Sequence, residues 1–282
     1  MFNGEDYLAA ALDSLLAQTY SNFEIVLSDN ASTDDTQAIC EDYAKRDYRI
    51  RYYRQPRNVG AAGNFNHTFE LAHGEYFKWH AHDDVCAPTF LEHCVAGLDA
   101  NPNAVLCCTK TCFIDAQGQH ERDYEHPLDL ETKTRSERFL QFVLPGHIVV
   151  EIFGVIRSDV LRKTPLIAGY IGSDLVLLAE LGLYGPFLVV SEYLFFHREH
   201  PQRSVYSHQD PKARTTWFDT SKSGKRAMPS WRLLKEHMIS LMHVRLPMLE
   251  RAQIALGILR RGNWQRRRLK DELMAVVFTQ SA

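Results

Sequence analysis

The sequence has no uninterrupted apolar run of 18 or more residues, and its N-terminus has no basic segment followed by an apolar one. The first absence argues against a transmembrane helix and the second against a secretory signal, so we expect a cytoplasmic location. The charges nearly balance, with a formal net charge of −3 over 282 residues. That balance gives no reason to expect nucleic acid as a partner.

Common cysteine and glycine signatures are also missing. The small-residue turn from Asn58 to Asn64 has the wrong glycine spacing for a dinucleotide fingerprint and lacks the Gly-Lys-Ser/Thr ending of a P-loop. Close packing of a helix on a sheet explains its glycines. The cysteines have no paired metal-ligand spacing and predict reduced, buried thiols: Cys40, Cys86, Cys94, Cys107, Cys108 and Cys112.

The apolar residues that are present follow the periods of helices and strands. Hydrophobic residues make up 45% of the chain, which is ample for a sizeable core. Helices that alternate with strands predict βαβ units and an α/β fold with a mostly parallel central sheet flanked by helices. In residues 1–110 we expect helices over 5–18, after Ser32, near Phe65 and from Pro88, and strands over 23–27, 50–53, 76–80 and from Val105.

One element of such a fold is missing at the start. The chain opens at Met1-Phe2-Asn3-Gly4, in a turn followed by a helix, whereas a doubly wound unit begins with a strand. A central strand of about five or six residues cannot be omitted without leaving backbone groups of its neighbours unpaired. We therefore expect the given start to lie inside a longer natural chain. The alternative is an impaired protein.

Two adjacent carboxylates follow the aromatic strand expected over 76–80. Asp83 and Asp84 would lie at the carboxyl end of that strand, where α/β folds bind ligands. Hard oxygen ligands at this position suit Mg²⁺ or Mn²⁺, which usually hold substrate phosphates. An Asp-Asp turn that only caps the following helix is an equally good explanation of the pair.

Two further polar segments stand next to expected helices. The loop 28–34 follows a strand and opens a helix, a position suited to a nucleotide, and Asp29 could accept hydrogen bonds from a base or a ribose. The alternative is a turn capped by its own side chains. Asp174 precedes the apolar run 175–181, where an acid in the first turn also complements the helix dipole.

Taken together, these loops carry a family resemblance. The segments Asp29-Asn30-Ala31-Ser32-Thr33-Asp34, Asn58-Val59-Gly60 with Asn64, Gly74-Glu75-Tyr76 and His82-Asp83-Asp84 closely resemble the family 2 glycosyltransferases. The match in order and spacing covers roughly residues 1–110. It implies the GT-A fold and the transfer of a sugar from a nucleotide diphosphate donor to an acceptor hydroxyl, with inversion and a divalent metal.

The resemblance also implies roles for residues of the first half. Asp29 would contact the base, Asn58 would help to bind the nucleotide sugar, and Asp83 would lie near the ribose and the metal. Asp84, the last carboxylate of an Asp-x-Asp-like motif, would bind Mn²⁺ or Mg²⁺. His82 replaces the first Asp of that motif, a departure that weakens metal affinity or alters donor choice.

In the second half, Asp174 matches the catalytic base of the family, which takes the proton of the acceptor hydroxyl. The segment 197–204 resembles the basic segment that closes over the diphosphate. His200 would be a further metal ligand, and Arg198 or Arg203 would offset charge on the leaving diphosphate.

The resemblance sets the expected organisation. A GT-A domain would cover 1–210, with a nucleotide-binding half (1–110) and an acceptor-binding half (111–210), and a helical extension would cover 211–282. The extension carries basic clusters at 260–261 and 266–268. Such helices could rest on the inner face of an anionic membrane, near a lipid-linked acceptor, although a solvated helix face is the commoner explanation.

One rival belongs to another class of enzyme. His80, His82, Asp83 and Asp84 have ligand types that Zn²⁺ accepts, which suggests a metal-dependent hydrolase. That hypothesis leaves the nucleotide-type loops unexplained.

Overall fold

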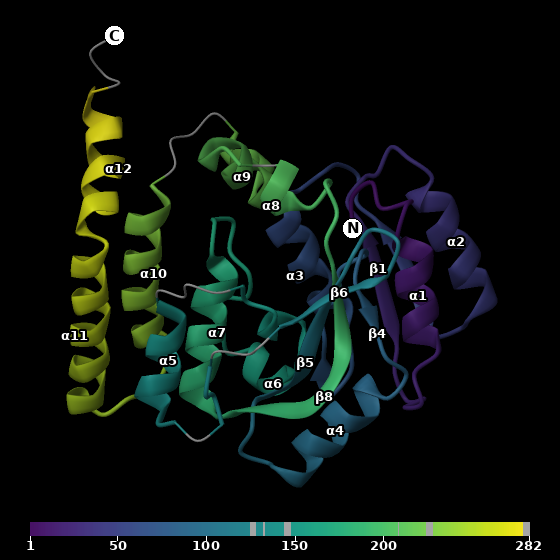
Figure 1. Cartoon of the computed structure of the whole chain (residues 1–282), viewed down its shortest axis with the longest axis horizontal. Coiled ribbons are helices and arrows are strands. Elements are labelled where there is room, and N and C mark those ends of the chain that lie inside the picture. The colour runs from purple at the N-terminus through teal and green to yellow at the C-terminus, as the bar shows by residue number, and fades with distance from the viewer. Residues whose placement is uncertain (125–127, 132, 144–147, 208, 224–227, 279–282) are drawn as a thin grey trace.

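The computed structural model describes residues 1–124, 128–131, 133–143, 148–207, 209–223 and 228–278. Within these ranges, helices surround a mixed sheet, and the first and last helices lie on opposite flanks of the molecule (Figure 1). Among the described helices, none combines the length and the hydropathy that a membrane-spanning segment requires.

The strands form two separate sheets. One has two strands, β1–β2, and the other has the order β3-β7-β5-β8-β4, with β6 paired to β5. Their bounds are β1 (Ile25–Asp29), β2 (Ile50–Arg54), β3 (Tyr76–Phe77), β4 (Val85–Cys86), β5 (Leu106–Ile114), β6 (His120–Tyr124), β7 (Val155–Arg157) and β8 (Phe187–Arg198).

The larger sheet corrects one expectation. Only β1–β2 and β5–β8 pair in parallel, whereas β3–β7, β4–β8, β5–β6 and β5–β7 are antiparallel. The predicted mostly parallel sheet is therefore a mixed one. A short turn after Ile114 joins β5 to β6, and so short a connection permits only an antiparallel pair.

The helices occupy most of the predicted helical segments. Their bounds are α1 (Leu8–Leu16), α2 (Thr36–Arg46), α3 (Ala61–Leu71), α4 (Phe90–Ala100), α5 (Arg135–Val143), α6 (Ser158–Leu161), α7 (Ser173–Tyr184), α8 (Ser204–Ser207), α9 (Pro211–Phe218), α10 (Pro229–His243), α11 (Met248–Trp264) and α12 (Arg266–Phe278), with short 3₁₀ turns at Glu151–Phe153 and Thr220–Lys222. Helices α9 to α12 lie within the described residues of the predicted extension, and its boundary at residue 211 stays a prediction.

Two local expectations were wrong. The strand expected over 76–80 ends at Phe77, and the rest of that segment leads to the carboxylate pair without strand pairing. Ser32 does not cap α2, whose N-cap residue is Asp35. Instead the Ser32 hydroxyl accepts a hydrogen bond from the Asn3 backbone N–H at 2.9 Å, which ties the N-terminal turn to the loop after β1.

The two sheets are separated by a cavity of about 1910 Å³. Apolar side chains from both sides line it, among them Leu12 and Leu27 on the α1–β1 side and Phe77 on the β3 side. At one end of β1 the Met1 amine donates to the Ser28 carbonyl at 2.8 Å, and the Asn30 N–H donates to the Met1 carbonyl at 2.9 Å. These two bonds are those that a parallel strand makes around one residue of its neighbour.

Candidate active site

Asp84 is held in place by the end of β8. His197 Nδ1 lies 2.8 Å from Asp84 Oδ1, and the Arg198 backbone N–H donates to the same oxygen at 3.0 Å. Asp84 is fully buried, and its second oxygen, Oδ2, has no hydrogen-bond partner among the described residues. A buried carboxylate oxygen without a donor costs free energy unless a cation or another group satisfies it.

Arg203 extends this arrangement toward the cavity. Its Nη2 lies 2.5 Å from His197 Nε2. Because a guanidinium can only donate, His197 Nε2 accepts, and Nδ1 carries the proton that it donates to Asp84. Arg203, His197 and Asp84 therefore form one chain of hydrogen bonds that fixes both the imidazole and the carboxylate.

Asp83, the neighbouring carboxylate, pairs with a different histidine. His200 Nε2 lies 2.9 Å from Asp83 Oδ2, and the His200 ring packs on Tyr7 with centroids 4.5 Å apart. Burial alone would raise the pKa of Asp83, but the hydrogen bond from His200 and the nearby histidine charges hold that pKa well below its usual range. The same hydrogen bond raises the pKa of His200. Asp83 is thus an anion that faces the cavity.

Asp29 organises its own loop. Its Oδ1 accepts from the Ser32 N–H at 2.8 Å, and its Oδ2 accepts from Tyr52 at 3.0 Å and from Arg54 at 2.9 Å. Asp29 is fully buried and is not among the cavity-lining residues. A contact between Asp29 and a base would require the loop to move so that a carboxylate oxygen reaches the cavity.

Asn58 does reach the cavity. Its Oδ1 accepts from Asn30 Nδ2 at 3.0 Å and from the Gly60 N–H at 2.9 Å. Gly60 has φ of 87°, and a Cβ there would approach the Phe218 carbonyl to 2.5 Å, so this turn and α9 pack together only because the residue is glycine. The Asn58 turn is therefore the point where the nucleotide-type loops meet the helices of the second half.

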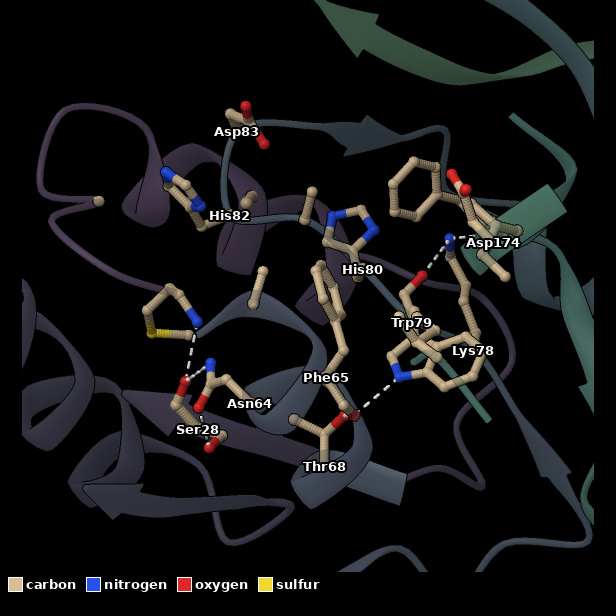
Figure 2. Close-up of a pocket in the computed structure, with 18 of the residues that line it drawn as sticks. Ser28, Asn64, Phe65, Thr68, Lys78, Trp79, His80, His82, Asp83 and Asp174 are labelled. Carbon is tan, nitrogen blue, oxygen red and sulfur yellow. Dashed lines mark hydrogen bonds between the residues drawn. The ribbon is translucent and has the colours of Figure 1, made fainter. Parts of the chain in front are cut away.

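Asp174 lines the same cavity from the other side, at the start of α7 (Figure 2). Its Oδ1 accepts from the Leu175 N–H at 3.0 Å, and Gly172 before it has φ of 81°. Burial raises the pKa of Asp174 against the effect of these backbone hydrogen bonds. A raised pKa suits a general base, because it strengthens the affinity for a proton.

The structure therefore divides the predicted site residues into two groups. Asn58, Asp83, Asp174 and His200 line the cavity. Asp29, Asp84 and Arg198 lie behind its wall and are not among the lining residues. The Arg198 guanidinium is used within the protein, since its Nε donates to the Asp83 carbonyl at 2.8 Å and its Nη1 to the Asp115 carbonyl at 3.1 Å.

Sequence reasoning missed two residues of the site. Lys78 is half-buried in the aromatic segment, donates to the Phe153 carbonyl at 2.5 Å, and lies over two phenylalanine rings. Figure 2 shows it beside Trp79 in the cavity wall. Burial lowers its pKa. A lysine inside an apolar strand pattern was the available signal. His197, the partner of Asp84, had no such signal because the two are 113 positions apart.

Asp83, Asp84 and His200 have the ligand types for part of the coordination shell of a divalent cation, but not for all of it. Among the described residues, Asp83, Asp84 and His200 do not bring three donor atoms within 4.8 Å of one another, so they do not form a closed protein cage. Mg²⁺ and Mn²⁺ need no such cage, because one or two carboxylates together with substrate phosphates hold them. The unsatisfied Oδ2 of Asp84 and the anionic Asp83 meet that requirement.

The zinc-hydrolase arrangement is not found. Within the described ranges, His80, His82, Asp83 and Asp84 do not place three ligand atoms within 4.8 Å of one another. His80 Nε2 instead lies 3.1 Å from the Asp84 carbonyl oxygen, and burial lowers the pKa of His80 to about 3. His80, His82 and Asp83 line the cavity, and the four residues do not form a zinc centre.

Comparisons with known proteins identify the family. The family model described as glycosyl transferase family 2 matches residues 1–164. An uncharacterized glycosyltransferase of Rickettsia typhi is 34% identical over 199 residues, which are 70% of this chain and 59% of that protein. Glycosyltransferase GlyG of Streptococcus pneumoniae is 35% identical over 92 residues, 33% of this chain and 31% of that protein. The chain thus spans about 59% of the Rickettsia relative's length.

Solved structures share the fold. TarS (residues 1–349) of S. aureus, in complex with UDP, superposes with a TM-score of 0.66 at 17% identity, covering 93% of this chain and 69% of that one. The mannosyltransferase PcManGT from Pyrobaculum calidifontis, in complex with GDP-Man and Mn²⁺, superposes with a TM-score of 0.53 at 16% identity, covering 98% and 83%. The fold is therefore that of GT-A glycosyltransferases, and the chain belongs to glycosyl transferase family 2.

Proposed function

We propose that this protein transfers a sugar from a nucleotide-diphosphate donor to a hydroxyl of a polysaccharide or related glycan. The observation that carries the proposal is the placement of Asp83 and Asp174 on the wall of one cavity, with the orphaned oxygen of Asp84 behind the first. One end of the cavity offers anionic oxygens for a cation, and the other offers a base. Relatives with UDP, UDP-GlcNAc or GDP-Man bound support a nucleotide-sugar donor.

In this proposal the donor lies between the loop after β1 and the Asp83–Asp84 segment. Asn58 and Asp83 contact the nucleotide from the cavity wall, and Asp29 and Arg198 hold the two loops in place from behind. Arg203, which lines the cavity, replaces Arg198 as the residue that faces the diphosphate. An arginine suits that place because its planar fork matches phosphate oxygens.

The metal would be Mn²⁺ or Mg²⁺, held by Asp84 with Asp83 or His200 beside it. When bound, such a cation neutralises the charge of the leaving diphosphate. The contribution of the chain's own residues is to hold the Asp84 carboxylate in one orientation through His197 and the Arg198 N–H. A ligand fixed in this way is ready before the donor arrives.

Asp174 acts as the base. It takes the proton of the acceptor hydroxyl while the hydroxyl oxygen forms a bond to the anomeric carbon and the bond to the diphosphate breaks. Attack on the face opposite the leaving group inverts the configuration. The partly buried carboxylate with a raised pKa supports this role, since a positioned base of matched pKa contributes about 10²–10⁴-fold to such steps.

The acceptor is a glycan, free or lipid-linked, and the C-terminal helices favour contact with a membrane. Residues 228–278 contain ten Lys and Arg and four Asp and Glu, while the whole chain has a net charge of −3. The side chains of Met242, Leu259 and Trp264 are 70%, 62% and 80% exposed on these helices. Exposed apolar groups beside arginines are typical of helices that lie on anionic lipid surfaces.

The experiment that tests the proposal is a donor screen. The purified protein is incubated with Mn²⁺ and a panel of nucleotide sugars, and mass spectrometry measures release of the nucleoside diphosphate. We expect release from one donor class, dependent on the divalent ion and absent in the Asp174→Asn variant when an acceptor is present. Release of free sugar and diphosphate that survives the removal of Asp174 would indicate a hydrolase and contradict the proposal.

A further inference from the structure

A second group of metal-binding side chains lies outside the cavity, on the β5–β6 hairpin. Cys112 comes from β5, and His120 and Asp123 come from β6. Their ligand atoms, one from each residue, lie within 4.8 Å of one another. The Cys112 Sγ is 3.5 Å from Asp123 Oδ1, and His120 Nε2 is 2.9 Å from the same oxygen.

A β-bulge brings the three residues to one face. Cys112 stands directly opposite Asp123 in the antiparallel ladder, whereas His120, three residues away, would normally point to the other face. The register shifts between Phe113 and Ile114, which pair with Arg122 and His120, so one residue of β6 is skipped. Such a bulge re-aims a side chain, and here it turns His120 toward Asp123.

The distances fit a tetrahedral ion. Zn²⁺ binds thiolate at ~2.3 Å and imidazole or carboxylate at ~2.0–2.1 Å, which places sulfur and oxygen ~3.5 Å apart and nitrogen and oxygen ~3.3 Å apart. The Cys112–Asp123 distance already has the first value, and the His120–Asp123 distance requires a movement of a few tenths of an ångström. Thiolate and imidazole favour Zn²⁺ over Mg²⁺ or Mn²⁺, which prefer oxygen.

We propose that Cys112, His120 and Asp123 bind one Zn²⁺, with water in the fourth position. Binding replaces the thiol proton of Cys112, which is released to solvent, so that the sulfur coordinates as thiolate. His120 and Asp123 have side chains 60% and 50% exposed, so the site is open to solvent on the side of β6, while Cys112 is buried behind it.

This site is distinct from the metal site of the donor and has its own consequence. The turn that joins β5 to β6 supplies the Asp115 and Ala116 carbonyls that accept from the Arg198 guanidinium, at 3.1 and 3.2 Å. Arg198 in turn donates to the Asp83 carbonyl. An ion that fastens β6 to β5 therefore holds in place the turn that positions Arg198 behind the carboxylate pair.

The test needs no substrate. Metal-free full-length protein is titrated with Co²⁺ in the absence of nucleotide, and the near-ultraviolet thiolate-to-cobalt charge-transfer band is recorded; Zn²⁺ affinity follows from displacement of the Co²⁺. We expect one site per chain that Mg²⁺ does not occupy. Cys112→Ser should abolish the charge-transfer band, and His120→Asn and Asp123→Asn should each weaken Zn²⁺ binding at least tenfold.

The controls separate coordination from folding. His93 forms a surface pair with Glu192 at 3.1 Å and belongs to no cluster of three metal-ligand atoms among the described residues, so His93→Asn should leave Zn²⁺ affinity unchanged. His120 is exposed, so His120→Asn reports on the site even if Cys112→Ser proves unstable in thermal melts. The proposal is wrong if wild-type protein shows no thiolate band with Co²⁺, or if His120→Asn and Asp123→Asn bind Zn²⁺ as tightly as wild type.

Discussion

His197 Nδ1 lies 2.8 Å from Asp84 Oδ1, and this bond joins the last strand of the sheet to the carboxylate proposed to hold the metal. The other ring nitrogen of His197 accepts from Arg203, which lines the cavity. The His197 imidazole therefore links Arg203 to Asp84, because it accepts from the guanidinium and donates to the carboxylate. The orientation of Asp84 depends on β8 as much as on its own loop.

Removal of this imidazole should weaken the metal site. We expect His197→Leu to lower kcat/KM and the apparent affinity for Mn²⁺ by about 10–100-fold, the usual cost of losing a partner that orients a metal ligand. Titration of Mn²⁺ in the transfer assay measures both quantities. His93→Leu, at a histidine–carboxylate pair on the surface, is the matched control. An unchanged Mn²⁺ requirement in His197→Leu would remove His197 from the metal site.

Replacement of the proposed base should separate binding from transfer. Asp174→Asn keeps the size of the side chain but cannot take a proton, so transfer should fall by about 10²–10⁴-fold with an unchanged donor Kd. Asp159, an exposed acid in the first turn of α6, provides the control variant Asp159→Asn. Equal transfer rates for Asp174→Asn and wild type would exclude Asp174 as the base.

The rate should also depend on pH through Asp174. The base must be deprotonated, and burial raises its pKa, so kcat should fall as the pH drops through a value above the ordinary range of an Asp carboxyl. A profile of kcat against pH with the preferred donor measures this limb. A rate that stays constant down to the usual pKa of Asp would contradict a base with a raised pKa.

Two histidines with lowered pKa values should make the fold sensitive to acid. Burial lowers the pKa of His80 to about 3 and that of His237 to about 4, so both stay neutral when the unfolded chain takes up protons. Their contribution to stability is therefore present above pH ~6.5 and is lost as the pH falls, at about 1.4 kcal/mol per pH unit for each. Urea unfolding from pH 7 to 5 should show that slope, and His237→Gln should reduce it. An identical slope in His237→Gln would contradict the assignment.

From the cavity between the two sheets, we predict that an apolar strand added before Met1 stabilises the folded protein. The bonds between Met1 and residues 28 and 30 already follow a parallel ladder, and burial lowers the pKa of the Met1 amine. Burying an apolar side chain contributes roughly 1.5–3 kcal/mol and ordering a residue costs ~1–2 kcal/mol. Six residues of Val, Ile and Leu fused before Met1 should raise Tm by about 5 °C or more.

The control for this fusion is a segment of six Ser and Gly residues, which cannot fill an apolar cavity. Differential scanning calorimetry of the two fusions gives the comparison. Faster hydrogen exchange of β1 amides in the Ser-Gly fusion than in the apolar fusion would locate the effect. Equal Tm values and equal exchange rates would show that the cavity does not accept a strand.

Much of the first half could be predicted from the sequence, because its signals are local. The period of Leu8 and Leu12 predicted α1, and the polar loop expected after Leu27 follows β1, which runs two residues further, to Asp29. The pair at Asp83 was expected directly after a strand, but it lies six residues beyond the end of β3 and directly before β4. A local pattern, however, does not show which side of a loop faces the cavity. Asp83 faces it and Asp84 is buried, although the two are adjacent.

The structure of the second half could not be predicted in the same way, because it depends on pairings between segments that are distant in sequence. The apolar segments 187–190 and 193–196 are separated by polar residues in sequence, yet both lie in the single strand β8, because its irregular register with β5 absorbs the interruption. That strand brings His197 to Asp84 and gives the sheet its mixed character. Likewise, Cys112 and His120 have no metal-ligand spacing in sequence, and only the bulge in the hairpin brings them together.

The most direct test of the account is calorimetry of nucleotide-sugar binding with and without Mn²⁺, on wild type and on Asp84→Asn. We predict that the donor class found in the screen binds with Mn²⁺, that EDTA weakens this binding at least tenfold, and that Asp84→Asn loses the Mn²⁺-dependent part alone. Binding of every activated sugar with the same affinity in Mn²⁺ and in EDTA, or no binding at all by folded protein, would contradict the central claim.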